Sequence, residues 1–196
     1  MRKCYWTRTR PDQILAAEVL RMTGKANTGF TVVAWIVLAA AAPSPIVAGE
    51  KSPSDVAFER LQSLVGTWEG VEKGSKRPTV ATYALTGGGK VLIEVMGGMS
   101  TAYHLDKGTL VLTHFCGAGN QPRMRVKTIE NDGRHIAFEM YDITNHPNPD
   151  SYYSSALDVR FLEDGTVELA YRGMTAGRES RQTFHLVKRL SSRATR

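Results

Sequence analysis

The sequence predicts an all-β fold of about ten antiparallel strands, closed into an up-and-down barrel and preceded by a short helix. Short apolar runs follow one another from residue 66 onward, with no helical stretch between them. Tight glycine-containing turns such as Asp132-Gly133 and Asp164-Gly165 separate the runs, which is typical of β-hairpins. Consecutive hairpins favour a meander, and closing the meander into a barrel removes its exposed edges.

The expected helix precedes the first strand. Ser52 or Ser54 is a good N-cap, and Phe58, Leu61 and Leu64 follow at helical spacing. We expect this helix to end by Gly66 and to cover one end of the sheet. The strands are expected at residues 66–73, 79–85, 90–96, 100–105, 109–116, 123–129, 135–141, 155–161, 166–171 and 181–188.

Alternation along the strands separates a wet face from a dry one. Met124 and Val126, for example, alternate with Arg123 and Arg125. The run at residues 110–116 is apolar on both faces instead. Such a strand needs cover from the N-terminal helix or from a second copy of the chain, so a homodimer through this hairpin is one hypothesis.

Residues 1–49 are interpreted as lying outside the fold. Residues 22–49 resemble a secretory signal peptide, with Lys25, an apolar run at residues 30–42 and a small-residue end at Ala48 and Gly49. The apolar run is too short for a membrane span of roughly 20 residues. We therefore expect cleavage, export to the periplasm or the cell exterior, and no stable membrane insertion afterwards. Residues 1–21 are interpreted as a misassigned upstream extension, the alternative being an extended signal n-region.

The charge of the remaining chain gives no reason to expect a nucleic-acid partner. The formal net charge is +6, but residues 1–49 carry six of the 25 basic side chains and two of the 19 acidic ones. The rest has a net charge of about +2 and no basic run with interleaved aromatics. Removing Cys4 leaves Cys116 alone, so no internal disulfide is expected. The expected parts are a linker and helix at 50–65, one barrel at 66–190 and a tail at 191–196.

Two groups of sequence features resemble known families. Leu64-Val65-Gly66-Thr67-Trp68-Glu69-Gly70 resembles the opening of lipocalins and the wider calycin group, in which the tryptophan closes one end of the barrel. The region at about 55–190, with its Tyr103-His104-Leu105-Asp106 stretch, looks like a family of exported bacterial lipocalin-like domains of unknown function. The resemblance implies the fold and says little about activity.

The hairpin at residues 99–116 holds two of the five histidines, and its register decides whether they meet. A two-residue turn at Lys107-Gly108 places His104 and His114 on opposite faces. A three-residue loop that also includes Asp106 places them on one face. Both loops are common for such a sequence, so the register stays open at this stage.

Aromatic and methionine side chains spread over the strands supply an adaptable apolar lining. Ten strands are slightly too many for the interior to be filled completely, which favours a cavity, and ten-stranded relatives such as the fatty-acid-binding proteins bind one small apolar molecule. We therefore predict a small apolar or amphipathic ligand. The expected contacts come from Tyr103, His104, His114, Arg123 and Met124.

A haem or metal protein with weak redox or isomerase activity is the alternative. His114 and Cys116 share a strand face and are suitable ligands for zinc or copper, although a satisfied buried histidine beside an inert cysteine explains them equally. Gly66-x-Trp68-x-Gly70 and His185 are similar to nitrobindin, a ten-stranded haem barrel, and this implies His185 as the iron ligand. Simple alternation, however, places His185 on the outer face.

Catalytic motifs are lacking from the sequence. It contains no Gly-x-Ser-x-Gly and no paired carboxylates at fixed spacing, so we expect a binding protein rather than an enzyme. Glu94 interrupts an apolar strand. Pointing inward, it would be a buried acid with a raised pKa and a partner for an inward arginine or histidine; more often such a residue lies on the solvent face.

Overall fold

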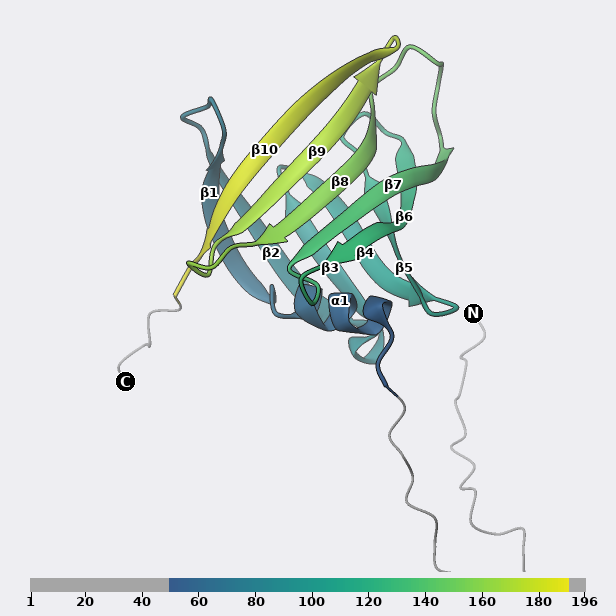
Figure 1. Ribbon diagram of the computed structural model, residues 1–196. Helices are drawn as coiled ribbons and strands as arrows, with labels where there is room; N and C mark the ends of the chain where they lie inside the picture. The colour runs from purple at the N-terminus through teal and green to yellow at the C-terminus, as the bar shows by residue number, and fades with distance from the viewer. Residues whose placement is uncertain (1–49, 191–196) are drawn as a thin grey trace, which may run out of the picture. The chain divides into compact units, whose positions relative to one another are not determined.

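The computed structural model describes residues 50–190, which form a closed antiparallel barrel of ten strands preceded by one α-helix (Figure 1). Each strand pairs with its neighbours in sequence, and β1 pairs with β10 to close the barrel. The predicted fold class is therefore confirmed. The expected upstream extension, signal peptide and tail lie outside the described residues.

The elements follow the expected order, and all ten predicted strands are present. A single turn of 3-10 helix, Gly87–Gly89, joins β2 to β3. The bounds of the others are α1 Pro53–Gln62, β1 Gly66–Glu72, β2 Pro78–Thr86, β3 Val91–Met96, β4 Met99–Asp106, β5 Thr109–Phe115, β6 Gln121–Glu130, β7 His135–Thr144, β8 Tyr153–Phe161, β9 Val167–Thr175 and β10 Arg178–Lys188.

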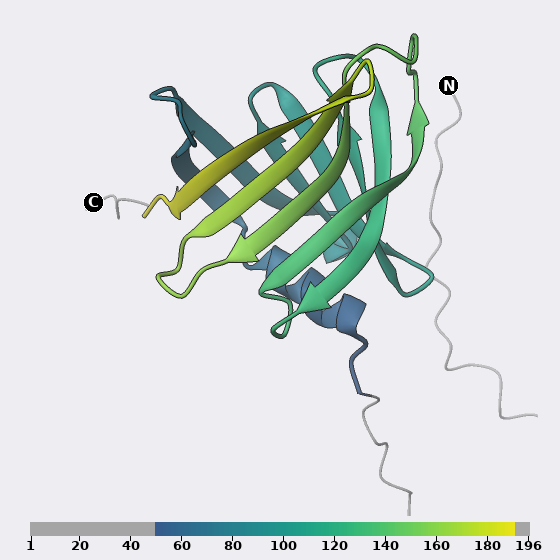
Figure 2. The ribbon, with the colours of Figure 1, turned by 45° about the horizontal axis from the view of Figure 1, so that its top comes forward.

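Helix α1 closes one end of the barrel (Figure 2). Ser52 is its N-cap and forms a capping box with Asp55, which satisfies two backbone N–H groups at the start of the helix. The buried face of α1 consists of Ala57, Phe58 and Leu61. Within residues 50–190, no helix has the length and apolar character that a membrane span requires.

Hydrogen bonds from α1 and from the turn that follows it link this segment to the barrel, among them one from the Gln62 side-chain amide to the Gly89 carbonyl at 3.0 Å. The indole N–H of Trp68 donates to the Leu64 carbonyl at 2.6 Å, and the Leu110 N–H donates to the Ser54 hydroxyl at 3.3 Å. Trp68 is only 5% exposed, at the first strand and next to the helix, as the resemblance to lipocalins implies. This end of the barrel is therefore sealed by apolar side chains with their polar atoms paired.

The hairpin between β4 and β5 has the two-residue turn. Asp106 lies opposite Thr109, and both Lys107 and Gly108 have positive φ, as a type I′ turn requires. His104 and His114 therefore lie on opposite faces. Leu112 is 1% exposed and lies inside, so it forms no surface on which a second copy could dock, and the homodimer itself stays a prediction.

The opposite end of the barrel is open along β10. Gln182 lies directly opposite Tyr171, and cross-strand partners share a face of the sheet. Two and four residues further along the same inner face, Phe184 is half-buried and Leu186 is fully buried. Gln182 is nevertheless exposed to solvent. Solvent therefore reaches the inner face of β10 at the end away from α1.

Candidate ligand-binding site inside the barrel

A row of four polar side chains crosses four neighbouring strands inside the barrel. Tyr83 on β2 lies opposite Glu94 on β3, which lies opposite Thr101 on β4, which lies opposite His114 on β5. Because directly opposed residues share a face, the four side chains point inward together. They are 3%, 2%, 1% and 4% exposed, respectively. The closed sheet thus builds a polar row in a dry interior.

Two more tyrosines complete the cluster around Glu94. The Tyr103 hydroxyl donates to Oε2 of Glu94 at 2.8 Å, and the Tyr171 hydroxyl donates to Oε1 at 2.9 Å. Tyr171 reaches Glu94 from β9, far away in the barrel wall, because the strands close on themselves. Its ring also lies 5.7 Å from the His114 ring, centroid to centroid. We call Tyr83, Glu94, Thr101, Tyr103, His114 and Tyr171 the Glu94 layer.

Burial dominates the electrostatics of Glu94. Loss of hydration raises the pKa of its carboxyl group, and the hydrogen bonds from the tyrosines offset this only in part. Burial, followed by the charge of Glu94, raises the pKa values of Tyr83, Tyr103 and Tyr171 well above the ordinary value. The three phenols therefore remain protonated hydrogen-bond donors at neutral pH.

His114 is neutral in this environment. Burial lowers its pKa to about 4, and its Nδ1 lies 3.0 Å from the hydroxyl oxygen of Thr101. A neutral imidazole has one nitrogen that donates a hydrogen bond and one that accepts. His114 therefore adds hydrogen-bonding capacity to the layer without adding charge.

Glu94 has no cationic partner in the described part of the chain. Between residues 50 and 190 it is the sole Asp, Glu, Lys or Arg whose side chain is buried. The ion pairs of this region lie elsewhere, and none includes Glu94. Polar groups in a barrel interior lower stability unless they are paired, so an uncompensated acid at this position points to a function.

One hydroxyl of the layer is left without a hydrogen bond. The Tyr83 hydroxyl oxygen is fully buried and has no partner among residues 50–190. A buried hydroxyl without a well-formed hydrogen bond costs about 1–3 kcal/mol of stability, so a polar group that completed the bond would be favoured. Tyr83 lies opposite Glu94, and its hydroxyl is close enough to lower the pKa of the carboxyl group, although the contact lacks the geometry of a full hydrogen bond.

The residues predicted to contact a ligand divide between the two faces. Tyr103, His114 and Met124 are buried inside the barrel. His104 lies on the outer face, and Arg123 forms an ion pair with Asp142 on the outer surface. The structure thus brings the first three into one interior and separates the last two from it. Whether any of them contacts a ligand stays a prediction.

The predicted metal and haem ligands do not form one cluster. Cys116 is buried directly after β5, whereas His185 is exposed on β10, where it lies opposite Val71 and Glu168. No group of three or more metal-ligating side chains occurs between residues 50 and 190. Metal binding by His114 and Cys116, and haem binding by His185, stay predictions.

Sequence reasoning found only part of the Glu94 layer. Glu94 was ambiguous because Ile93 and Val95 on its other side are as apolar as Leu92 and Met96 on its own. Tyr83 and Tyr171 looked like apolar lining. The sequence offers no signal that separates the two sides of this strand, because the burial of Leu92 and Met96 on the side of Glu94 is seen only in the structure.

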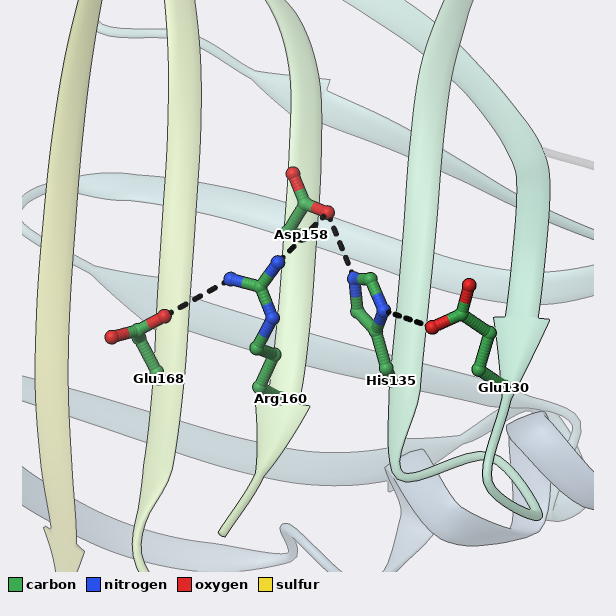
Figure 3. A network of polar contacts seen from close by, with 5 residues as sticks. All are labelled: Glu130, His135, Asp158, Arg160 and Glu168. Atoms are coloured by element: carbon green, nitrogen blue, oxygen red, sulfur yellow. Dashed lines mark hydrogen bonds and ion pairs between the residues drawn. The ribbon is translucent and has the colours of Figure 1, made fainter.

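A second polar network lies on the outer face of the barrel (Figure 3). His135 is held between Glu130 and Asp158 at 3.0 Å on each side, and Arg160 joins Asp158 to Glu168. Burial alone would lower the pKa of His135, but the bonds to the two carboxylates raise it overall. Each charge in this network has a partner, so the network fastens β6 to β9 together. Glu130, His135 and Arg160 also line a hollow of about 620 Å³ on the outer surface.

Comparison of the chain with models of known protein families and with curated proteins finds no match. The interior chemistry and the open end are therefore the observations on which a functional proposal rests.

Proposed function

We propose that this chain is a lipocalin-like barrel protein that binds one small, largely apolar molecule inside the barrel, at the Glu94 layer. The buried layer is the observation that carries the proposal. Apolar side chains would fill the same interior at lower cost, as they do next to α1. Ligand sites in barrels combine apolar walls with a few convergent polar groups, and the layer supplies such groups.

The open end supports the same proposal. Gln182 is exposed to solvent on the inner face of β10, directly opposite Tyr171 of the layer. The opposite end is closed by α1 and Trp68. A ligand would enter away from α1, with its polar group meeting Glu94 and its apolar part lying against the aromatic side chains.

We also propose that the protein acts outside the cytoplasm. The support is the sequence of residues 22–49, whose charged start, apolar run and small-residue end fit an export signal. An exported barrel with a polar layer in an otherwise apolar interior suits the capture or carriage of a small molecule. Amino-terminal sequencing of the protein recovered from its own cells would check this, and a chain that retains residues 22–49 would contradict it.

Binding of N-phenyl-1-naphthylamine tests the interior site. This probe is uncharged at neutral pH and fluoresces strongly in dry surroundings. We expect saturable binding to the full chain, and Gln182→Trp should weaken it by about tenfold or more because the indole fills the inner side of the opening. Arg181→Trp is the matched control, since Arg181 is an exposed neighbour facing outward.

Two results would overturn the proposed function. One is the absence of saturable fluorescence with the full chain. The other is equal weakening by Gln182→Trp and Arg181→Trp, which would place the probe on the outer surface. Thermal unfolding of both variants, compared with the unaltered chain, verifies that each is folded.

A further inference from the structure

We propose that the ligand is a small organic cation whose charged group pairs with Glu94 and lies among the aromatic rings around it. This inference rests on the proposed function and narrows it to one chemical class. It follows from the charge of the interior, the geometry of the aromatic side chains and the hydrogen bonds that Glu94 leaves unused.

The charge balance of the interior favours a cation. Glu94 is the one buried Asp, Glu, Lys or Arg between residues 50 and 190, and no described lysine or arginine neutralises it. A buried carboxylate is stable only when paired or strongly hydrogen-bonded. A ligand that brings a positive charge supplies the missing partner.

The carboxyl group has room in its hydrogen-bonding pattern for such a partner. Each oxygen of Glu94 accepts one bond, from Tyr103 and Tyr171 respectively. An ionised carboxylate has about four lone-pair sites, so roughly half remain for an ammonium or guanidinium donor. Tyr103 and Tyr171 already hold the carboxyl in place, which lowers the cost of forming the pair.

Aromatic rings surround the same position. The Tyr171 ring contacts the rings of His114 and Phe184, with centroids 5.7 and 6.3 Å away, and Tyr103 lies 6.0 Å from Phe138. Aromatic faces attract cations, and the attraction grows when water is excluded. A carboxylate with several aromatic rings beside it is thus suited to a positive group attached to an apolar body.

An anionic ligand fits this interior poorly. A fatty-acid carboxylate would lie beside Glu94, and no described lysine or arginine is buried to hold it. His114 is neutral at pH 7, because burial holds its pKa near 4. The barrel therefore differs in ligand charge from a carrier of fatty acids, although both have ten strands.

Displacement of the naphthylamine probe by three eight-carbon ligands tests the inference. Octylamine, 1-octanol and octanoate share one alkyl chain and differ in the charge of the head group at pH 7. We expect octylamine to displace the probe about tenfold or more better than 1-octanol, because a charge-assisted hydrogen bond replaces a neutral one. Octanoate should be the weakest of the three.

Glu94→Gln isolates the contribution of the charge. The amide keeps the shape of the side chain, so 1-octanol should bind as before, whereas the preference for octylamine should disappear. Glu69→Gln is the matched control: Glu69 lies on the outer face of β1, where it pairs with Arg189, and its change should leave the preference intact.

A calorimetric measurement on the unaltered chain covers the case in which Glu94→Gln does not fold. Burial raises the pKa of the Glu94 carboxyl group, and a cation that pairs with it lowers that pKa again, so pairing removes the proton over the pH range between the two values. Octylamine binding should therefore release up to about one proton, seen as a dependence of the heat on the buffer. 1-Octanol should release none.

The outcomes separate this inference from the proposed function. Equal displacement by octylamine and 1-octanol, or a preference for octylamine that survives Glu94→Gln, would overturn the inference that the ligand is a cation paired with Glu94. The proposal of an interior site would stand. Stronger displacement by octanoate would do the same. Failure of the probe itself to bind would instead overturn the proposed function.

Discussion

Burial at single residues sets the chemistry of this barrel, and His114 shows it most clearly. Its ring lies on the inner face of β5, 4% exposed, with Thr101 as its hydrogen-bond partner. Burial lowers its pKa from 6.5 to about 4. Glu94 shifts in the opposite sense, since burial raises its pKa. Both shifts favour the uncharged form of the side chain, as expected in a dry interior.

The shift at His114 predicts an acid sensitivity of the fold. A base whose pKa is lower in the folded state stabilises the protein above the unfolded pKa of 6.5, and this contribution is lost as the pH falls through about 4. The loss amounts to roughly 3 kcal/mol of unfolding free energy for a shift of this size. In His114→Gln that part of the pH dependence should vanish in denaturant unfolding measured from pH 7 to 4.

His104→Gln is the control for this measurement, because His104 is the histidine of the same hairpin that faces outward. It should keep the slope of the unaltered chain. A slope that persists in His114→Gln would show that other groups cause the acid sensitivity.

Prediction from the sequence fails at particular residues for a physical reason. Whether Glu94 faces inward or outward was open because β3 is apolar on both sides, with Val95 47% exposed on the outer side. The tyrosines that hydrogen-bond to Glu94 were still harder to predict from the sequence. Tyr171 contacts Glu94 only because the barrel closes, and no local sequence pattern in β9 predicts that contact.

The strands and the helix were predictable from the sequence where neighbouring residues alone determine where they begin and end. The number and order of strands followed from the turn glycines, since positions such as Gly97 and Gly98 have positive φ. The hairpin register did not follow, because it depends on Lys107 adopting positive φ, a conformation that lysine does not require.

Helix α1 makes an element-scale prediction possible, since two serines were candidates for its cap. Ser52 caps it, and its hydroxyl accepts from the Asp55 N–H at 3.2 Å. Ser52→Ala should reduce the unfolding free energy by about 1 kcal/mol, because the first turn loses its cap. Equilibrium unfolding in urea measures the change.

Ser63→Ala is the matched control at the other end of the same helix. Its hydroxyl is exposed and bonds only the Arg60 carbonyl, so the change should cost less than that at Ser52. A loss at Ser52 no greater than that at Ser63 would show that the capping box contributes no more than a single exposed hydrogen bond at the helix end.

At the scale of the whole molecule, the two ends of the barrel differ. The end at α1 is sealed, whereas the other end carries the connection at residues 145–152 between β7 and β8 (Figure 1). The Tyr152 ring packs directly on Gly173, on the inner side of β9, in space that a β-carbon would occupy. Asn120 fixes this connection by donating from its side chain to the Tyr152 carbonyl at 2.6 Å.

This arrangement predicts that Tyr152 controls the rate of ligand entry. In Gly173→Ala the added methyl group displaces the ring from the inner face, so association and dissociation of the naphthylamine probe should both accelerate several-fold while the affinity changes little. Tyr152→Ala should have the same effect. Glu179→Ala, an exposed neighbour on the outer face of β10, is the control and should leave the rates unchanged in stopped-flow fluorescence.

Comparing the association and dissociation rates of the probe with its affinity shows whether Tyr152 only lines the entrance or also contacts the bound ligand. A group that only lines the entrance changes both rates by the same factor, because it acts on the transition state and not on the bound complex. A change confined to dissociation would instead place Tyr152 in contact with the bound ligand. Unchanged rates in Gly173→Ala and Tyr152→Ala would mean that ligands reach the Glu94 layer by the exposed side of β10, past Gln182, without passing the ring.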